Sequence, residues 1–194
     1  MFDTKMAKSS GEFWVASVLS RYGWGAALTR DGLERTDILA VKADYSRRMV
    51  EVQVKAATDT GREVSWPVNA KSQLFAHSER EWFVFVALPG ASHVAPRSFI
   101  VPRDHVSAAA WIEHTDWLTE KSIPAGQRNA PVDRARVLER TWAGYQDRWV
   151  FLESSAFDAP VLLPARFRTL APDERVGLPP GHPWTDVLPI FHGE

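Results

Sequence analysis

Residues 50–55 alternate strictly between apolar and polar side chains. The apolar members are Val50, Val52 and Val54, and the polar members between them are Glu51, Gln53 and Lys55. Because successive side chains of a β-strand point to opposite faces, the pattern predicts a strand with a valine face and a polar face. The polar face carries an acid, an amide and an ammonium in a row. Buried charges need partners, since an unpaired charge is costly to desolvate, and a metal ion would be such a partner.

A second strand is predicted just before this one. Residues 36–43 form it, and a polar turn over residues 44–48 joins it to the alternating strand at 49–56. Asp37 lies at the head of the first strand of this antiparallel pair. We therefore expect the Asp37 carboxylate to approach Gln53 and Lys55.

This arrangement resembles the signature of the PD-(D/E)XK nuclease superfamily, which has an Asp on one strand and an (Asp/Glu)-x-Lys on the next. Asp37 and Lys55 match the signature, and Gln53 replaces the second acid. Some branches of the superfamily share this departure, including certain intron-encoded endonucleases and uncharacterised bacterial proteins with Gln-Val-Lys. The helix before the first strand is also similar to that of Holliday-junction resolvases. The resemblance covers about residues 9–101.

The resemblance implies a site for Mg²⁺ or Mn²⁺, hard cations that take oxygen ligands. Asp37 would be the anchor ligand, joined by the Gln53 side-chain oxygen and the main-chain carbonyl of Val54. Lys55 would orient the attacking water or stabilise charge on the phosphorane. A neutral amide at position 53 weakens cation binding unless another carboxylate compensates, and Glu51 is one candidate for that role.

Glu12 has two interpretations. In many superfamily members a glutamate on the helix before the first strand reaches the metal, so the resemblance makes Glu12 a catalytic candidate. Ser9-x-x-Glu12 also matches a capping box, in which the glutamate bonds back to the Ser9 amide and only stabilises the first helical turn.

The rest of the pattern predicts an α/β protein with a restriction-endonuclease-like core, in which helices flank a central mixed β-sheet in the order αβββαβ. The expected helices are 9–22, 69–80 and 103–121, and the expected strands are 24–29, 36–43, 49–56, 64–68, 82–88 and 97–101. The run at 82–88 has no polar alternation, which is typical of a central strand covered on both faces. In the helix at 103–121, Trp117 is expected to pack inward.

Residues 1–121 are interpreted as the nuclease-like core, and residues 122–194 as an extension packed on it. A loop at 122–132 precedes an expected helix that begins at Asp133 and buries Ala135, Leu138, Trp142, Tyr145 and Trp149. Beyond residue 159 the chain holds seven of its thirteen prolines, so regular helix is not expected there.

The net charge is −1, so the molecule lacks the basic excess typical of nucleic-acid-binding proteins. Contact with DNA would depend on a local patch, because phosphate binding needs clustered basic side chains. Candidates for this patch are Arg21, Arg30, Arg35, Arg47, Arg48 and Lys71, each of which is otherwise an ordinary solvated charge. The chain has no cysteine and no apolar run long enough to span a bilayer, so we expect a cytoplasmic protein without a membrane partner.

The function expected from these observations is that of a metal-dependent DNA endonuclease, in restriction, repair or defence. One alternative is a catalytically degenerate module of the same fold that binds nucleic acid or a protein without cleavage, with Gln53 marking lost metal binding. Another is an interaction protein that uses its aromatic and proline-rich C-terminal half. A homodimer is also expected, since duplex cutting in this superfamily often uses paired subunits.

Overall fold

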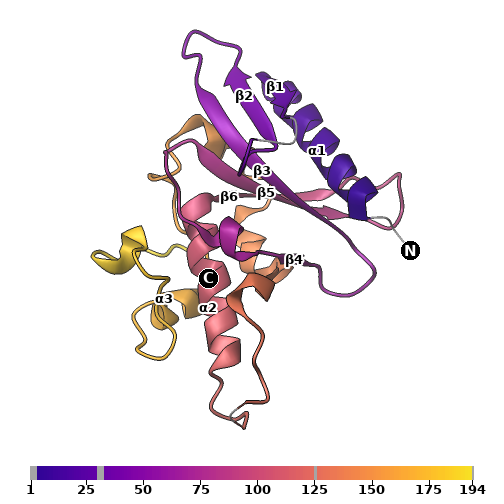
Figure 1. Ribbon diagram of the computed structural model, residues 1–194. Coiled ribbons are helices and arrows are strands. Elements are labelled where there is room, and N and C mark those ends of the chain that lie inside the picture. The colour runs from indigo at the N-terminus through magenta and orange to yellow at the C-terminus, as the bar shows by residue number, and fades with distance from the viewer. Residues whose placement is uncertain (1–3, 30–32, 125, 194) are drawn as a thin grey trace.

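The structure, a computed structural model, describes residues 4–29, 33–124 and 126–193. Arg30, one of the candidates for DNA contact, lies outside this range. Helix α1 (Thr4–Arg21) precedes three antiparallel strands, β1 (Trp24–Leu28), β2 (Ile38–Lys42) and β3 (Met49–Thr58) (Figure 1). Strand β5 (Glu81–Leu88) pairs in parallel with β3, and β6 (Arg97–Pro102) pairs antiparallel with β5. The five-stranded sheet has the order β1-β2-β3-β5-β6, which confirms an α/β protein with a mixed sheet.

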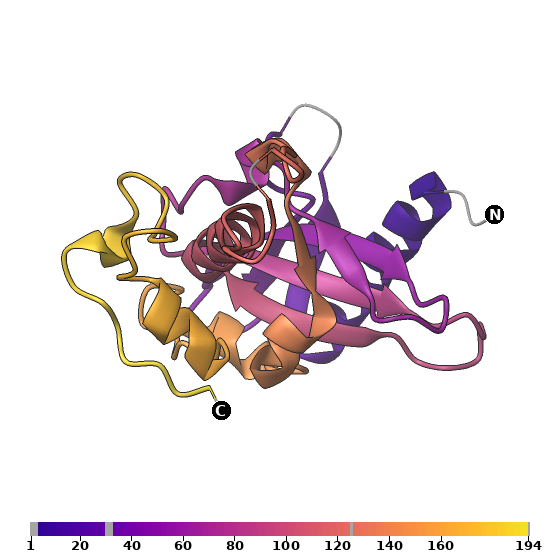
Figure 2. The ribbon, with the colours of Figure 1, turned by 90° about the horizontal axis from the view of Figure 1, so that it is seen from below.

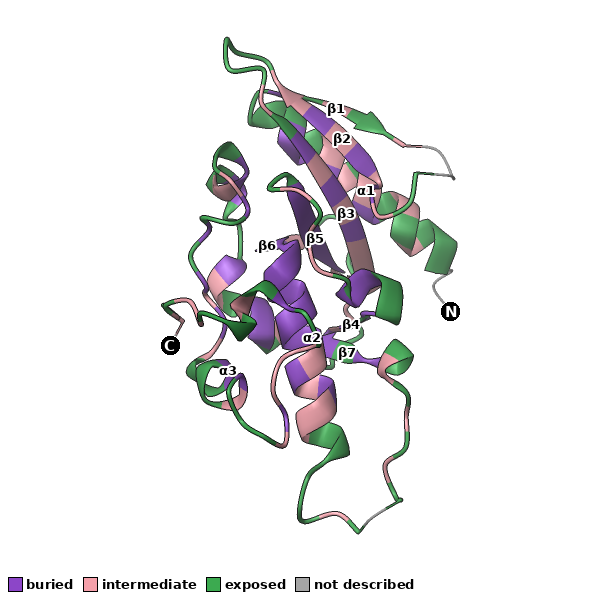
Figure 3. Cartoon of the chain, turned by 60° about the vertical axis from the view of Figure 1, so that its left-hand side comes forward, coloured by how far each residue is buried: buried purple, intermediate pink, exposed green. Residues whose placement is uncertain are grey.

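The two faces of the sheet are covered by different parts of the chain. The alternating valines of β3 are buried under α1, while its polar residues face the side of α2 (Arg103–Leu118). Figure 3 shows this alternation along β3 as bands of buried and intermediate residues. The predicted alternation is therefore confirmed, and so is the central position of β5, which is buried from Glu81 to Ala87.

The predicted helix at 69–80 is wrong. After β4 (Ser65–Pro67) the chain forms only a 3₁₀ turn, η1 (Ala70–Gln73), with Asn69 as the expected cap, and then runs irregularly to β5. Backbone amides of this segment donate to side-chain carboxylates and not to helical carbonyls: Ala76 donates to Asp104, and His77 and Ser78 donate to Glu81. Because these amides already have acceptors, they do not need the carbonyl acceptors that a helix would supply.

The helix expected from Asp133 is also wrong. That segment contains the 3₁₀ turns η2 (Val132–Arg134), η3 (Glu139–Tyr145) and η4 (Trp149–Glu153), with strand β7 (Arg136–Leu138) between the first two. Ala135, Trp142, Tyr145 and Trp149 are buried as expected, and β7 pairs with β4. Leu138, which was also expected to be buried, is half-buried at the end of β7. Separate short turns thus bury most of the residues that a continuous amphipathic helix would bury, so the spacing of apolar residues alone does not distinguish the two structures.

The C-terminal segments pack beside α2 and complete the core on that face of the sheet (Figure 2). Phe83 and Phe85 of β5 share this core with Trp142, Tyr145 and Phe167. A short helix, α3 (Ala165–Leu170), begins directly after Pro164, so the expectation that the tail has no regular helix is wrong there. A final 3₁₀ turn, η5 (Pro183–Thr185), follows it. Trp117 is 42% exposed rather than packed inward.

Candidate functional site

Asp37 directly precedes β2, at the point where β3 loses β2 as its partner and stays paired with β5 alone. Strand β2 pairs with β3 only as far as Ile38 and Val52, so the following residues of β3 extend past it. The Asp37 amide donates to the Val52 carbonyl at 2.9 Å, and its Oδ2 accepts from the Val54 amide at 2.8 Å. The side chain is thereby fixed over the strand segment that carries Gln53 and Lys55.

The main-chain carbonyl of Val54 projects into the same space. The N–H and C=O of one strand residue leave the strand on the same side, and the Val54 N–H points to Asp37. Asp37 and the Val54 carbonyl therefore present oxygen atoms to a common volume, as the family resemblance implies for the metal site.

Helix α1 brings Glu12 and Lys8 to this position. Gly11 is buried against β3, where an added Cβ would lie 2.5 Å from the Ala56 Cβ, so the helix packs as closely as its backbone allows. Lys8 Nζ lies 3.5 Å from Glu12 Oε1 and 3.8 Å from Asp37 Oδ1. One ammonium therefore lies beside two carboxylates from different elements.

The capping interpretation of Glu12 is wrong. Helix α1 already includes Thr4, so Ser9 lies inside the helix and its amide is not an unpaired N-terminal donor. The Glu12 carboxylate is instead next to Lys8, with 18% of its side chain exposed. It is thus placed beside Asp37 and not at a helix end.

Lys55 shares this environment. Burial lowers the pKa of the Lys55 ammonium, Asp37 opposes the shift, and the positive charges of Arg103 and Lys8 lower the pKa further. Asp37 is thus one of the charges that act on Lys55, and the convergence of the two groups on one cation stays a prediction. An amine with a lowered pKa beside a carboxylate can hold a water by hydrogen bonding and exchange a proton with it.

Gln53 is held by an arginine that sequence reasoning missed. Arg103, at the start of α2, donates to Gln53 Oε1 at 2.7 Å, and its guanidinium lies 4.6 Å from the centre of the Phe83 ring. The oxygen expected to bind a cation already accepts from a guanidinium. A metal ion on the same atom would be repelled by Arg103, so Gln53 as held here does not fit the role of a metal ligand.

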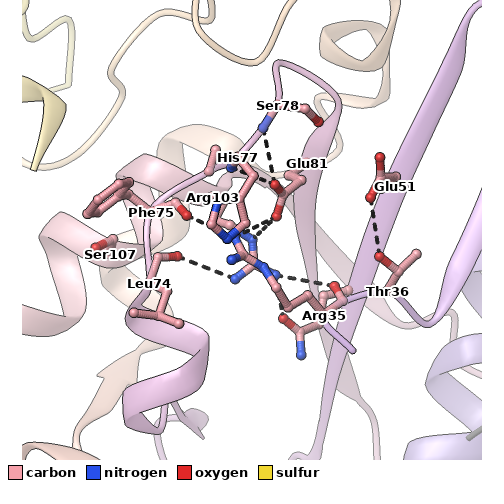
Figure 4. Close-up of polar contacts among 12 residues, drawn as sticks. Arg35, Thr36, Glu51, Leu74, Phe75, His77, Ser78, Glu81, Arg103 and Ser107 are labelled. Atoms are coloured by element: carbon pink, nitrogen blue, oxygen red, sulfur yellow. Dashed lines mark hydrogen bonds and ion pairs between the residues drawn. The ribbon is translucent and has the colours of Figure 1, made fainter. Parts of the chain in front are cut away.

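Arg103 belongs to a buried ionic network centred on Glu81 (Figure 4). Only 1% of the Arg103 side chain is exposed, and its Nε lies 2.8 Å from Glu81 Oε2 in an ion pair without hydrogen-bond geometry. Arg35 donates to the same oxygen at 2.7 Å, while the amides of His77 and Ser78 donate to Glu81 Oε1. Burial and the neighbouring Arg35 lower the pKa of Arg103 to about 10, although Glu81 opposes the shift.

Glu51 lies with this network and not with Asp37. It pairs in register with Glu81 across β3 and β5, and Thr36 Oγ1 donates to it at 3.5 Å. Its negative charge raises the pKa of Arg103. Glu51 is therefore placed to balance the buried guanidinium, whereas Glu12 shares the Lys8 ammonium with Asp37.

The basic residues expected to contact DNA are scattered. Arg35 is committed to Glu81 and to the Phe75 carbonyl, so its guanidinium points inward. Arg47 and Arg48 lie in the turn between β2 and β3, at the opposite end of β2 from Asp37. Lys71 is exposed on η1 and pairs with Glu34 at 2.9 Å. Arg21 is exposed at the end of α1, on the face of the sheet that α1 covers.

The oxygen donors that fit a hard divalent cation are Asp37, Glu12 and the Val54 carbonyl, with Lys8 now beside the two acids. Among the described residues, no group of three or more His, Cys, Asp or Glu side chains is arranged to hold a metal ion. Water and phosphate oxygens would have to complete a coordination shell, as they do at many Mg²⁺ sites. The Asp37 side chain is 21% exposed, which leaves it accessible from solvent.

Three residues of the site were missed from the sequence, Lys8, Arg103 and Glu81, and sequence reasoning could have found the first of them. Lys8 precedes Glu12 by one helical turn, so the pairing of these two side chains follows from helix geometry. Arg103 and Glu81 gave no local signal, because their partners lie far away in sequence.

Comparisons with known proteins add no family to this description. A scan against protein-family models, a search of curated proteins and a search of solved structures each found no match. In the described part of the chain, no helix combines the length and apolarity needed to cross a membrane. What the protein does must therefore be inferred from its own side chains.

Proposed function

We propose that this chain is a metal-dependent nuclease with a restriction-endonuclease-like fold, which hydrolyses phosphodiester bonds of DNA. The observation that carries the proposal is the position of the Asp37 carboxylate, which accepts from the Val54 amide and lies, together with Glu12, beside Lys8. The Lys55 ammonium responds to the charge of Asp37. Three different elements supply these groups, and each is fixed by backbone pairing or close helix packing.

The order of elements supports the fold assignment. A helix, three antiparallel strands and a parallel strand beside the third one follow the αβββαβ pattern of the superfamily. The departure is the crossover from β3 to β5, which contains β4 and η1 where the pattern has a helix. Support for the fold therefore rests on the strand arrangement and on α1.

Each residue has a role in the proposed reaction. A bound Mg²⁺ or Mn²⁺ would polarise the phosphate and lower the pKa of a water. Asp37, Glu12 and the Val54 carbonyl would hold the cation. Lys55 would orient the attacking water and stabilise the negative charge that develops on the phosphoryl oxygens. Arg103 would keep Gln53 turned away from the cation.

A degenerate binding module is the second candidate, and one observation favours it. The Gln53 oxygen is occupied by Arg103, so the position of the second family acid contributes nothing to cation binding. In that case the chain would bind nucleic acid without cutting it. The expected homodimer stays a prediction under either function.

Cleavage of DNA in Mg²⁺ or Mn²⁺, with EDTA as the blank, tests the proposal. Asp37→Asn is expected to lower both the cleavage rate and the Mn²⁺ affinity at least about tenfold, because it removes the anchoring charge while keeping the side-chain shape. Cleavage that persists unchanged in Asp37→Asn would assign the activity to a contaminant. Cation-independent binding of DNA without any cutting would favour the degenerate module.

Lys8→Met is expected to raise the Mn²⁺ affinity roughly fivefold. A cation bound by Asp37 and Glu12 competes with the Lys8 ammonium, and a unit charge at about 4 Å is worth about 1 kcal/mol in water. Titration calorimetry with Mn²⁺ measures the change, with Lys121→Met as the control for loss of an exposed lysine. Equal affinities in wild type and Lys8→Met would show that the cation does not lie near these carboxylates.

A further inference from the structure

A cavity of about 490 Å³ lies along the C-terminal half of α2, and five of its twelve lining residues are arginines. The arginines are Arg128, Arg134, Arg136, Arg140 and Arg166, against the acids Glu113, Asp116 and Glu120. Five positive and three negative charges leave an excess of two positive charges in the lining. This volume is in the range of pockets that hold one nucleotide-sized ligand.

Three of these arginines have no acidic partner. Arg136 donates to the hydroxyl and carbonyl of Ser65, and Arg128 donates to the carbonyl of Trp117, so neutral acceptors fix both guanidinium groups. The Arg134 side chain is exposed, and no hydrogen bond or ion pair joins it to any residue that the structure describes. Their charge is thus available to an anion, and the planar guanidinium is suited to bidentate binding of phosphate.

The same cavity holds an exposed aromatic ring. Trp117 is 42% exposed, and the Arg128 guanidinium lies 5.0 Å from the centre of its ring. An exposed indole beside a guanidinium group is a combination on which unpaired bases stack in single-strand binding proteins. Bases inside a duplex are already stacked on both sides and cannot enter such a cavity.

The cavity is connected to the candidate site through two short turns. The Gln73 side chain of η1 donates to the Val132 carbonyl, and the Ala70 amide donates to Asp133, so η1 and η2 are held together. Arg134 ends η2, while Lys71 on η1 pairs with Glu34 in the segment just before Asp37. The two bonded turns therefore join Arg134 of the cavity to the segment that precedes Asp37.

We infer that this arginine cavity binds a single-stranded segment of nucleic acid, with phosphates on the three uncompensated arginines and one base stacked on Trp117. The inference names the substrate class of the proposed nuclease: DNA with an overhang, flap or other unpaired stretch. It rests on the proposed function for cleavage only, since binding does not require the Asp37 site.

Fluorescence anisotropy in EDTA tests the inference without any cleavage. The probes are a labelled single-stranded oligonucleotide and a blunt duplex of the same sequence, at several salt concentrations. We expect the single strand to bind at least tenfold more tightly than the duplex. Trp117→Ala should weaken single-strand binding by about 10- to 100-fold, the loss typical of one stacked base. Arg134→Glu should weaken it and reduce the salt slope by about 0.7 or more.

Arg148→Glu is the matched control, because it makes the same charge change at an exposed arginine that does not line the cavity. Its binding should equal that of the wild type, and melting curves verify that every variant is folded. Equal binding by wild type, Trp117→Ala and Arg134→Glu would overturn the inference, as would a preference for the blunt duplex. If the single strand binds as expected but DNA is never cut in Mg²⁺ or Mn²⁺, the cavity assignment stands and the nuclease proposal falls.

Discussion

Lys55→Met is expected to abolish most phosphodiester cleavage, by about 100-fold or more, and at the same time to raise the melting temperature. The loss of rate follows from removing a positioned donor at the developing negative charge, where a single group is typically worth about 10²- to 10³-fold. The gain in stability follows from burial, which lowers the pKa of the Lys55 ammonium and so disfavours its charged form in the folded protein. A methionine fills similar volume without that charge, and a rise of about 2–4 °C is the expected scale.

The stability gain should depend on pH. Folding lowers the pKa of this lysine, so the charged form destabilises the folded state. The full penalty applies when the pH is below the pKa in the folded state. The penalty disappears as the pH rises toward the pKa in the unfolded state, which is about 10.4. The advantage of Lys55→Met should therefore shrink as the pH rises through that window. Lys42→Met is the control, because Lys42 is on the same sheet but pairs with Glu153 at 2.6 Å. A Lys55→Met protein that keeps full activity would remove Lys55 from the mechanism.

Arg103→Met is expected to lower the free energy of unfolding by about 3–5 kcal/mol, the usual cost of breaking a buried ion pair from one side. The substitution leaves Glu81 buried with Arg35 as its remaining charged partner and removes the donor that holds Gln53. For a chain of this size the change corresponds to a fall of roughly 6–20 °C in melting temperature. Chemical denaturation followed by tryptophan fluorescence measures it.

Arg97→Met is the matched control for that measurement. Arg97 also pairs with two carboxylates, Glu139 and Asp59, but 38% of its side chain is exposed. Exposed ion pairs contribute about 0–1 kcal/mol, so its loss should be small. Equal effects of Arg103→Met and Arg97→Met would contradict the buried network.

The polar face of β3 was predictable because strand periodicity is local. The alternation at residues 50–55 and the charge at Asp37 were enough to place those groups near one another. What holds Gln53 was not predictable, since Arg103 arrives from a helix fifty residues later. Nothing in the sequence around Gln53 distinguishes an amide that binds a cation from one that accepts from a buried guanidinium.

The errors in the fold have a common cause. At residues 69–80, the 3₁₀ turn η1 buries the polar residues Ser72 and Gln73 and leaves Leu74 exposed. After Asp133, apolar residues at helical spacing are buried by short 3₁₀ turns instead of by a continuous helix. Gly144 illustrates why: a Cβ there would lie 2.8 Å from the Leu162 carbonyl oxygen, so the chain makes a close approach that depends on a distant segment. Side-chain acceptors and neighbouring strands decided the backbone at these places, and neither is visible in a local window.

The core on the α2 side of the sheet is completed by residues from the last third of the chain, and this has a consequence for how the protein is made. Phe83 and Phe85 leave the ribosome well before Trp142 and Phe167, the residues that cover them. Contacts between such distant parts of a chain form slowly, and apolar strands left open in the meantime invite aggregation. A half-synthesised chain therefore carries an incomplete core beneath Lys55, and nascent molecules should depend on chaperones until the last third has emerged.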